Sequence, residues 1–448
     1  MRLVGRRQGL GVVKALVVTL VVALVVAAAG AACGGPTAVP QDGTRSSVPP
    51  GFGGRQLAVL SDTDMTATAY TGGNLGPDAG PDRLSLVPLQ GERTGTVVGA
   101  DVPNSVVAQP AALAIAPGGE LAVAAETTGP RTPTTHKLAD LPDGSRLTVV
   151  SLAGGTPEVV QSITVPAHPE TVAFAPDGTT VAVTFGPGEP RRLALVPVAD
   201  GRLGDPVFVG LPGARVPQKA TRVAQVDWHP SSRFLAVTLP SLNAEAFYEV
   251  APDRRSITPL GVPITVGNNP FMGRFTHDGR FFVVSSTAWN LGEDAPPGTV
   301  AVTRFDPGSV DATRVVSRAE AGYGPEGLTV SPDGRWVVTT NIELSANQVG
   351  TAARTEYTSI SLFALDRTGQ IDHADTVYDD AVLAEGAVVD GTGTWLATTA
   401  FQTRRDPESG AIEFWRIVDD RNSRGPRLVA THYSVPLPRG PHTMALIP

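Results

Sequence analysis

The chain has 448 residues, of which 42% are hydrophobic and 17% are charged, with 49 glycines and 40 prolines. This composition excludes a disordered chain and suits a turn-rich all-β protein that buries a sizeable core. Every charged side chain before Cys33 is basic, which leaves 31 basic against 43 acidic side chains in the remainder. We therefore expect no nucleic-acid partner.

The first 32 residues have the layout of an export signal. A basic stretch ending at Lys14 is followed by an apolar run over 15–29 and by small residues up to Cys33. Small residues before a cysteine resemble the bacterial lipobox, which implies a signal peptide over 1–32, lipidation of Cys33 and an extracytoplasmic, membrane-anchored protein. Gly30 stands where lipoboxes usually have an aliphatic residue, so ordinary cleavage and an uncleaved single-span anchor stay open.

No cysteine follows Cys33, which excludes disulfides within the remaining chain, thiol catalysis and redox chemistry of the Cys-x-x-Cys type. Residues 33–54 are rich in Gly, Pro, Ser and Thr and predict a flexible tether. The folded body is expected over residues 55–448.

One phrase recurs along this body: a short apolar strand, a tight turn and a second apolar strand. The turns end at positions 119, 178, 232, 279, 334 and 393, a mean spacing of about 55 residues. In the Pro-Asp-Gly copies, proline presets φ, aspartate caps the turn and glycine takes a positive φ. A second strand pair follows each hairpin, as over 360–369, so each unit is a four-stranded antiparallel sheet.

The two ends of the body complete one another. Residues 54–60 match the second strand of the phrase without a first strand before them, and residues 441–448 match a first strand that stops where the turn should begin. A seventh unit assembled from both termini closes the ring and removes exposed sheet edges. The sequence predicts an all-β, seven-bladed β-propeller of four-stranded antiparallel blades.

The stretch 324–343, Gly-Pro-Glu-Gly-Leu-Thr-Val-Ser-Pro-Asp-Gly-Arg-Trp-Val-Val-Thr-Thr-Asn-Ile-Glu, resembles the blade phrase of the lactonase-like seven-bladed propellers. Residues 362–369 resemble the hairpin that follows it in that family. The resemblance implies a fold that hosts both lactone hydrolases and exported ligand-binding proteins. Family members typically show Pro-Arg-His before the first strand, whereas this chain has Pro-Glu-Thr at 169–171, Pro-Glu-Gly at 325–327 and Pro-His-Thr at 441–443.

The residue that starts each innermost strand should occupy one ring of equivalent positions at a channel mouth. Counting eight residues back from each turn, and aligning the last blade on its proline, gives the ring Ala111, Glu170, Ala224, Phe271, Glu326, Glu385 and His442. Neighbouring polar candidates are Gln109, His168, Arg222 and Asn269.

Three chemical interpretations of this ring stay open. Glu170, Glu326, Glu385 and His442 would suit a divalent cation, since hard oxygen ligands with one imidazole bind such ions. Crowded carboxylates would also raise one another's pKa and supply a general acid or base. The third interpretation is a solvated, polar channel mouth.

A further acidic stretch precedes a glycine-rich segment. Asp62 and Asp64 precede the glycine-rich residues 72–82, but their spacing does not match an EF-hand loop. We expect a solvated loop between strands there.

Two main functions follow, and the sequence does not decide whether the protein is an enzyme. The first is a membrane-anchored module that binds a small molecule or an envelope protein, with His168 and Asn269 beside the ring as further ligand contacts. The second is a lactonase-like hydrolase in which Glu170, Glu326 or Glu385 activates water while Arg222 or His442 stabilises the oxyanion. A third candidate function is that of a structural partner in an envelope complex.

Overall fold

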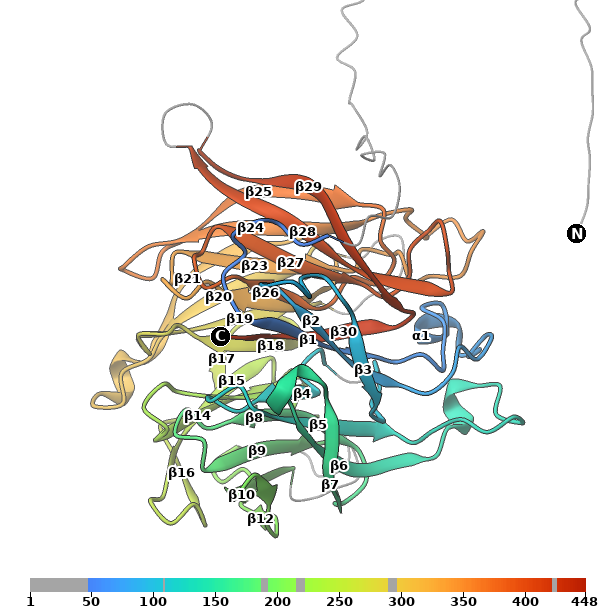
Figure 1. The fold of residues 1–448 in the computed structure, drawn as a ribbon. Coiled ribbons are helices and arrows are strands. Elements are labelled where there is room, and N and C mark those ends of the chain that lie inside the picture. Colours follow the sequence, from blue (N-terminus) through green and yellow to red (C-terminus); the bar gives the residue numbers. More distant parts are fainter. Residues whose placement is uncertain (1–46, 108, 187–191, 215–221, 289–295, 421–424) are drawn as a thin grey trace, which may run out of the picture. The chain divides into compact units, whose positions relative to one another are not determined.

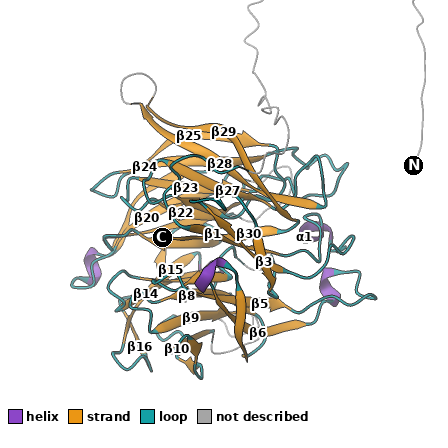
Figure 2. Ribbon diagram, viewed as in Figure 1, coloured by secondary structure: helices purple, strands orange, loops and turns teal. Residues whose placement is uncertain are grey.

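The computed structural model describes residues 47–107, 109–186, 192–214, 222–288, 296–420 and 425–448 (Figure 1). The predicted signal peptide, Cys33 and the first part of the tether lie outside these residues. Strands make up nearly all the regular structure, and helical turns are short (Figure 2). Within the described residues, no helix has the length and apolar character needed to cross a membrane.

The strands form seven antiparallel sheets, which are the seven predicted blades. Blade 1 comprises β4 (Leu113–Ile115), β5 (Leu121–Thr128), β6 (Asp143–Ser151) and β7 (Glu158–Thr164). Blade 2 comprises β8 (Pro169–Phe174), β9 (Thr180–Phe185), β10 (Leu193–Ala199) and an outer strand in two pieces, β11 (Arg202–Leu203) and β12 (Val207–Phe208). Blade 3 comprises β13 (Gln225–Trp228), β14 (Phe234–Leu239), β15 (Ala244–Val250) and the outer pieces β16 (Ile257–Pro259) and β17 (Ile264–Thr265).

The remaining blades follow the same plan. Blade 4 comprises β18 (Pro270–Phe275), β19 (Phe281–Ser286), β20 (Thr299–Arg304) and β21 (Arg314–Glu320). Blade 5 comprises β22 (Pro325–Val330), β23 (Trp336–Asn341), β24 (Thr358–Leu365) and β25 (Ile371–Asp379). Blade 6 comprises β26 (Ala387–Val389), β27 (Trp395–Ala400), β28 (Ser409–Asp420) and β29 (Gly425–Pro438).

Blade 7 contains both ends of the folded body, as the sequence predicts. It comprises β30 (Pro441–Ile447), β1 (Gln56–Ser61), β2 (Arg83–Pro88) and β3 (Val98–Asp101). The strand β30 pairs with β1, so the blue and dark red ends of the chain lie side by side in Figure 1. Each innermost strand contacts the next one around the ring, and β30 contacts β4, which closes the ring.

Tight turns and interblade packing explain why this sequence forms blades. Gly178 and Gly334 adopt φ values of 74° and 71° at the ends of Pro-Asp-Gly turns, a conformation that glycine reaches without a Cβ clash. The second strands β9, β14, β19 and β23 are buried along their whole length. Their mostly apolar character follows, because both faces of each blade are covered by neighbouring blades.

The segment between β1 and β2 differs from the predicted solvated loop. Met65, Ala67, Ala69 and Leu75 are fully buried and pack with residues of blades 5 and 6 in one cluster. This segment carries the short helix α1 (Ala69–Gly72). The prediction of a solvated loop is confirmed for residues 76–79, which are exposed, and wrong for the apolar side chains near α1, which cover a surface formed by other loops.

The packed body also reaches back before residue 55. Val48 and Phe52 are buried against blades 6 and 7, and the Gly53 amide donates a hydrogen bond of 2.8 Å to the Asp390 carboxylate. Residues 47–54, which the sequence assigns to a tether, therefore pack onto the propeller.

Candidate functional site

The fold brings the predicted ring positions to the starts of the innermost strands. Glu170, Glu326 and His442 are the second residues of β8, β22 and β30, and Glu385 lies two residues before β26. Glu170 is 3% exposed and the other three are 0% exposed. The interpretation of a solvated mouth is therefore wrong for these four side chains, which are shielded from water in the structure.

Glu326 and Glu385 lie on consecutive blades, and their carboxyl groups are close enough to perturb one another's pKa. Neither carboxyl oxygen of Glu385 has a hydrogen-bond partner among the described residues. Burial raises the pKa of Glu326 to about 7, and burial together with the nearby Glu326 raises that of Glu385 well above its usual value. At neutral pH the pair therefore places a base, Glu326, near a carboxyl group that holds its proton, Glu385.

Tyr70 covers this pair from α1. Its hydroxyl lies 3.3 Å from both carboxyl oxygens of Glu326. Burial and the charges of Glu326 and Glu385 raise the pKa of the Tyr70 hydroxyl, so it remains a neutral donor. The repeat pattern could not identify Tyr70, because it lies in a segment outside the repeated phrase.

Arg222 is the cation of the site. Its Nε lies 2.9 Å from Oε2 of Glu170, and its Nη2 donates to the Val107 carbonyl at 3.2 Å. Burial raises the pKa of Glu170, and the Arg222 guanidinium opposes that rise. Arg222 also interacts electrostatically with Tyr70 and Glu326, so its positive charge links Glu170 to the carboxyl pair.

His442 has partners of its own. Its Nε2 lies 2.8 Å from Oδ1 of Asn104, whose amide nitrogen donates to the carbonyls of Ser61 and Val102. Because Asn104 Oδ1 can only accept, His442 Nε2 carries the proton, and Nδ1 faces the Thr443 hydroxyl at 3.1 Å. Burial lowers the pKa of His442 to about 3, so at neutral pH it is a neutral imidazole whose Nε2–H is already donated to Asn104.

The other two ligand candidates point to partners on their own blades or loops. His168 contacts Asp143 at 3.1 Å through Nε2 and the Thr127 carbonyl at 3.2 Å through Nδ1. Asn269 donates from Nδ2 to the Thr287 hydroxyl at 2.6 Å. Within the described residues, neither side chain forms a hydrogen bond with Glu326 or Glu385.

The predicted cation site at the ring needs ligand atoms that converge on one point. Within the described part of the chain, one group of three or more carboxylate, imidazole or thiol groups has its ligand atoms within 4.8 Å of one another, and it is Asp62, Asp64 and Asp82. Glu170, Glu326, Glu385 and His442 do not form such a group. The structure places Glu326 near Glu385 and pairs Glu170 with Arg222 and His442 with Asn104.

Comparison with known proteins identifies the fold. No protein-family model matches the chain, and no curated protein matches it. A candidate 6-phosphogluconolactonase from Bacteroides uniformis superposes with a TM-score of 0.58 at 17% identity, over 88% of this chain and 100% of the other. The periplasmic gluconolactonase of Pseudomonas aeruginosa gives the same TM-score and identity over 88% of this chain and 99% of its own.

A third solved structure shows how widely the fold is used. A protein of unknown function from Desulfotomaculum acetoxidans has a TM-score of 0.58 at 13% identity, over 88% of this chain and 99% of its own. Such low identities establish a shared architecture and leave the chemistry to the site itself. The chain therefore has the seven-bladed fold seen in structures described as lactonases.

Proposed function

We propose that the protein is a lactonase-like hydrolase whose reaction centre is the carboxyl pair Glu326–Glu385. The observation that carries this proposal is the burial of two neighbouring carboxyl groups on consecutive blades, whose raised pKa values place a base near an acid at neutral pH. The proposed substrate class is a small sugar lactone, which the names of the structural neighbours support.

Each residue of the site has a role in ester hydrolysis. Glu326 takes a proton from water, whose oxygen attacks the ester carbonyl carbon. Arg222 and the Tyr70 hydroxyl stabilise the negative oxygen of the tetrahedral intermediate. Glu385 gives its proton to the alkoxide that leaves when the ring C–O bond breaks, and the product is the open hydroxy acid.

The proximity of the two glutamates also allows the site to be restored. After one turnover Glu326 carries a proton and Glu385 has lost one. Transfer of that proton between the neighbouring carboxyl groups returns both groups to their starting states. Atoms and charges then balance as lactone plus water giving hydroxy acid.

Substrate entry requires movement of the segment that carries Tyr70. Both glutamates are fully buried, and Tyr70 lies directly against Glu326. The anchoring of this segment includes a hydrogen bond of 2.7 Å from the Ala67 amide to Gln402 and one of 2.7 Å from the Thr71 hydroxyl to the Ala346 carbonyl. Displacing α1 would uncover the pair without disturbing the blades.

The test is hydrolysis of glucono-δ-lactone by the full-length protein. The reaction is monitored through the acid that it releases in weak buffer. Glu326→Gln and Glu385→Gln should each lower kcat at least about a hundredfold, since each removes one proton-transfer group. Glu120→Gln, a change at an exposed glutamate, is the matched control and should behave as the wild type. If the wild type binds the lactone without hydrolysing it, the proposed hydrolase function is overturned and a ligand-binding function is favoured.

We also propose export and lipid anchoring at Cys33, supported by the basic, apolar and small-residue stretches that precede it. Metabolic labelling with a radioactive fatty acid should mark the wild type and not Cys33→Ala. Unlabelled wild-type protein recovered in a soluble extracytoplasmic fraction would contradict anchoring and favour ordinary signal cleavage.

A further inference from the structure

Three aspartates meet at the base of the segment between β1 and β2. Asp62 directly follows β1, and Asp82 directly precedes β2. Because Ser61 pairs with Arg83 in the sheet, the two aspartates are brought together although they are far apart in sequence. Asp64 completes the group, and one carboxylate oxygen from each residue lies within 4.8 Å of the others.

The hydrogen bonds of this group leave one buried oxygen without a donor. Asp82 accepts bonds from the amides of Thr63 at 3.0 Å and Asn104 at 3.2 Å. Asp62 is only 2% exposed, and its Oδ2 accepts from the Val106 amide at 2.8 Å. Its Oδ1 has no hydrogen-bond partner among the described residues. An unpartnered buried carboxylate oxygen beside two further carboxylates calls for a cation.

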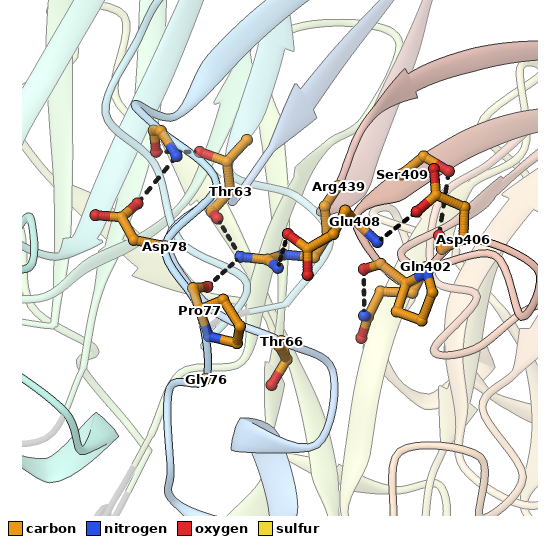
Figure 3. A network of polar contacts seen from close by, with 12 residues as sticks. Thr63, Thr66, Gly76, Pro77, Asp78, Gln402, Asp406, Glu408, Ser409 and Arg439 are labelled. Carbon is orange, nitrogen blue, oxygen red and sulfur yellow. Dashed lines mark hydrogen bonds and ion pairs between the residues drawn. The ribbon is translucent and has the colours of Figure 1, made fainter.

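Arg439 lies near the group but does not neutralise it. Figure 3 shows its guanidinium between Thr63, Pro77 and Glu408. Its Nη2 donates to the carbonyls of Thr63 at 2.7 Å and Pro77 at 2.6 Å, and its Nη1 pairs with Glu408 at 3.1 Å. These bonds hold the backbone of the segment, and Arg439 forms no hydrogen bond or ion pair with the three aspartates among the described residues, although its charge reaches Asp62.

Arg131 also donates its side-chain hydrogen bonds to backbone carbonyls. Its Nη1 donates to the carbonyls of Asp64 at 2.6 Å and Gly76 at 3.1 Å, and its Nη2 donates to the Thr135 carbonyl at 3.1 Å. Its backbone amide lies 3.3 Å from Asp64 Oδ2. Within the described chain, no side-chain ion pair is formed by Asp62, Asp64 or Asp82.

We propose that Asp62, Asp64 and Asp82 bind one hard divalent cation of the Ca²⁺ type. Three carboxylate ligands suit such an ion, and Asp64 and Asp82 are partly exposed, which leaves room for water to complete its coordination. The three ligands are not ring residues, although the Asp62 charge reaches Glu385 and Asn104 contacts both Asp82 and His442. The proposal stands whether or not the protein hydrolyses lactones.

The cation would fix the segment that carries Tyr70. Asp62 and Asp64 begin this segment and Asp82 ends it, so one ion would tie its two ends together. Tyr70 lies between them, against Glu326. The site would thus stabilise the covered arrangement of the channel mouth.

The experiment is calorimetric titration of Ca²⁺ into full-length protein that has been stripped with a chelator and kept in mild detergent, with thermal unfolding measured in parallel. The wild type should bind one equivalent of Ca²⁺, and Tm should rise with its concentration. Asp62→Asn and Asp64→Asn should each weaken Ca²⁺ binding at least about tenfold, since each removes a charged ligand.

Asp78→Asn is the matched control. Asp78 lies in the same segment and accepts a bond of 2.9 Å from the Gly80 amide, but it is outside the group. Its variant should bind Ca²⁺ as the wild type does. Asp64 is partly exposed, so Asp64→Asn remains informative if Asp62→Asn fails to fold. Absence of saturable binding at millimolar Ca²⁺, or equal binding by Asp64→Asn and the wild type, would overturn the proposal.

Discussion

Glu326 raises the pKa of the Glu385 carboxyl group, although the two residues lie at the starts of the innermost strands of two different blades. The propeller geometry explains this proximity, because β22 and β26 are neighbours around the channel. Neither carboxyl group is exposed to solvent, so both lie in a medium that disfavours two negative charges.

The first prediction concerns the protonation of this pair. Burial raises the pKa of Glu326 to about 7, so this group should be protonated at pH 5.5 and ionised at pH 8.5. The infrared difference spectrum between the wild type and Glu326→Gln should show a carboxylic acid band at pH 5.5. This band should disappear as the pH rises, with a midpoint near pH 7. A difference spectrum that shows only ionised carboxylate at pH 5.5 would refute the assignment.

The second prediction concerns the ion pair between Arg222 and Glu170. Arg222→Met leaves the nearly buried Glu170 carboxylate without its cation and should lower the free energy of unfolding by about 3–5 kcal/mol. Arg233→Met is the control, since Arg233 and Glu249 form an exposed pair at 3.0 Å that should contribute less than about 1 kcal/mol. Urea denaturation measures both changes. Equal losses of unfolding free energy in the two variants would contradict the larger contribution expected from the Arg222–Glu170 pair.

The third prediction concerns the pH dependence that His442 confers on stability. Burial lowers its pKa to about 3, below the value of about 6.5 expected in the unfolded chain, so the unfolded state binds the proton more tightly. Stability from the neutral imidazole is complete above pH 6.5 and is lost as the pH falls towards 3. Between pH 7 and 4 the wild type should lose about 2–3 kcal/mol more than His442→Gln.

Urea denaturation at both pH values gives this difference directly. His442→Gln preserves a donor for Asn104 Oδ1, so the variant should fold at pH 7. Parallel losses in the wild type and the variant would show that His442 is not held in its neutral form.

The sequence predicts the architecture well because the repeat reports it directly. The tight turns locate the hairpins, and the complementary ends at residues 54–60 and 441–448 predict the pairing of β1 with β30. Residues at equivalent positions of the repeat lie at equivalent places around the channel. The repeat therefore also places Glu326 beside Glu385.

The partners of the ring residues were not predictable in the same way. Tyr70 approaches Glu326 from a segment that has no counterpart in the other blades. The contact of His442 with Asn104 depends on a loop outside the repeated phrase. The alternation of apolar Met65, Ala67 and Ala69 with threonines offered one signal against a fully solvated loop, because all three apolar side chains are buried in one cluster.

The most direct test of the hydrolase is the pH dependence of kcat/KM for glucono-δ-lactone between pH 5 and 9, with spontaneous hydrolysis subtracted. Glu326 must be ionised to accept a proton from water, and its pKa is raised to about 7, so kcat/KM should rise with pH to a plateau with a midpoint near pH 7. Glu326→Gln should lose this rise along with the activity. A wild-type profile that is flat from pH 5 to 9, or activity that survives in Glu326→Gln, would contradict the proposed role of the carboxyl pair.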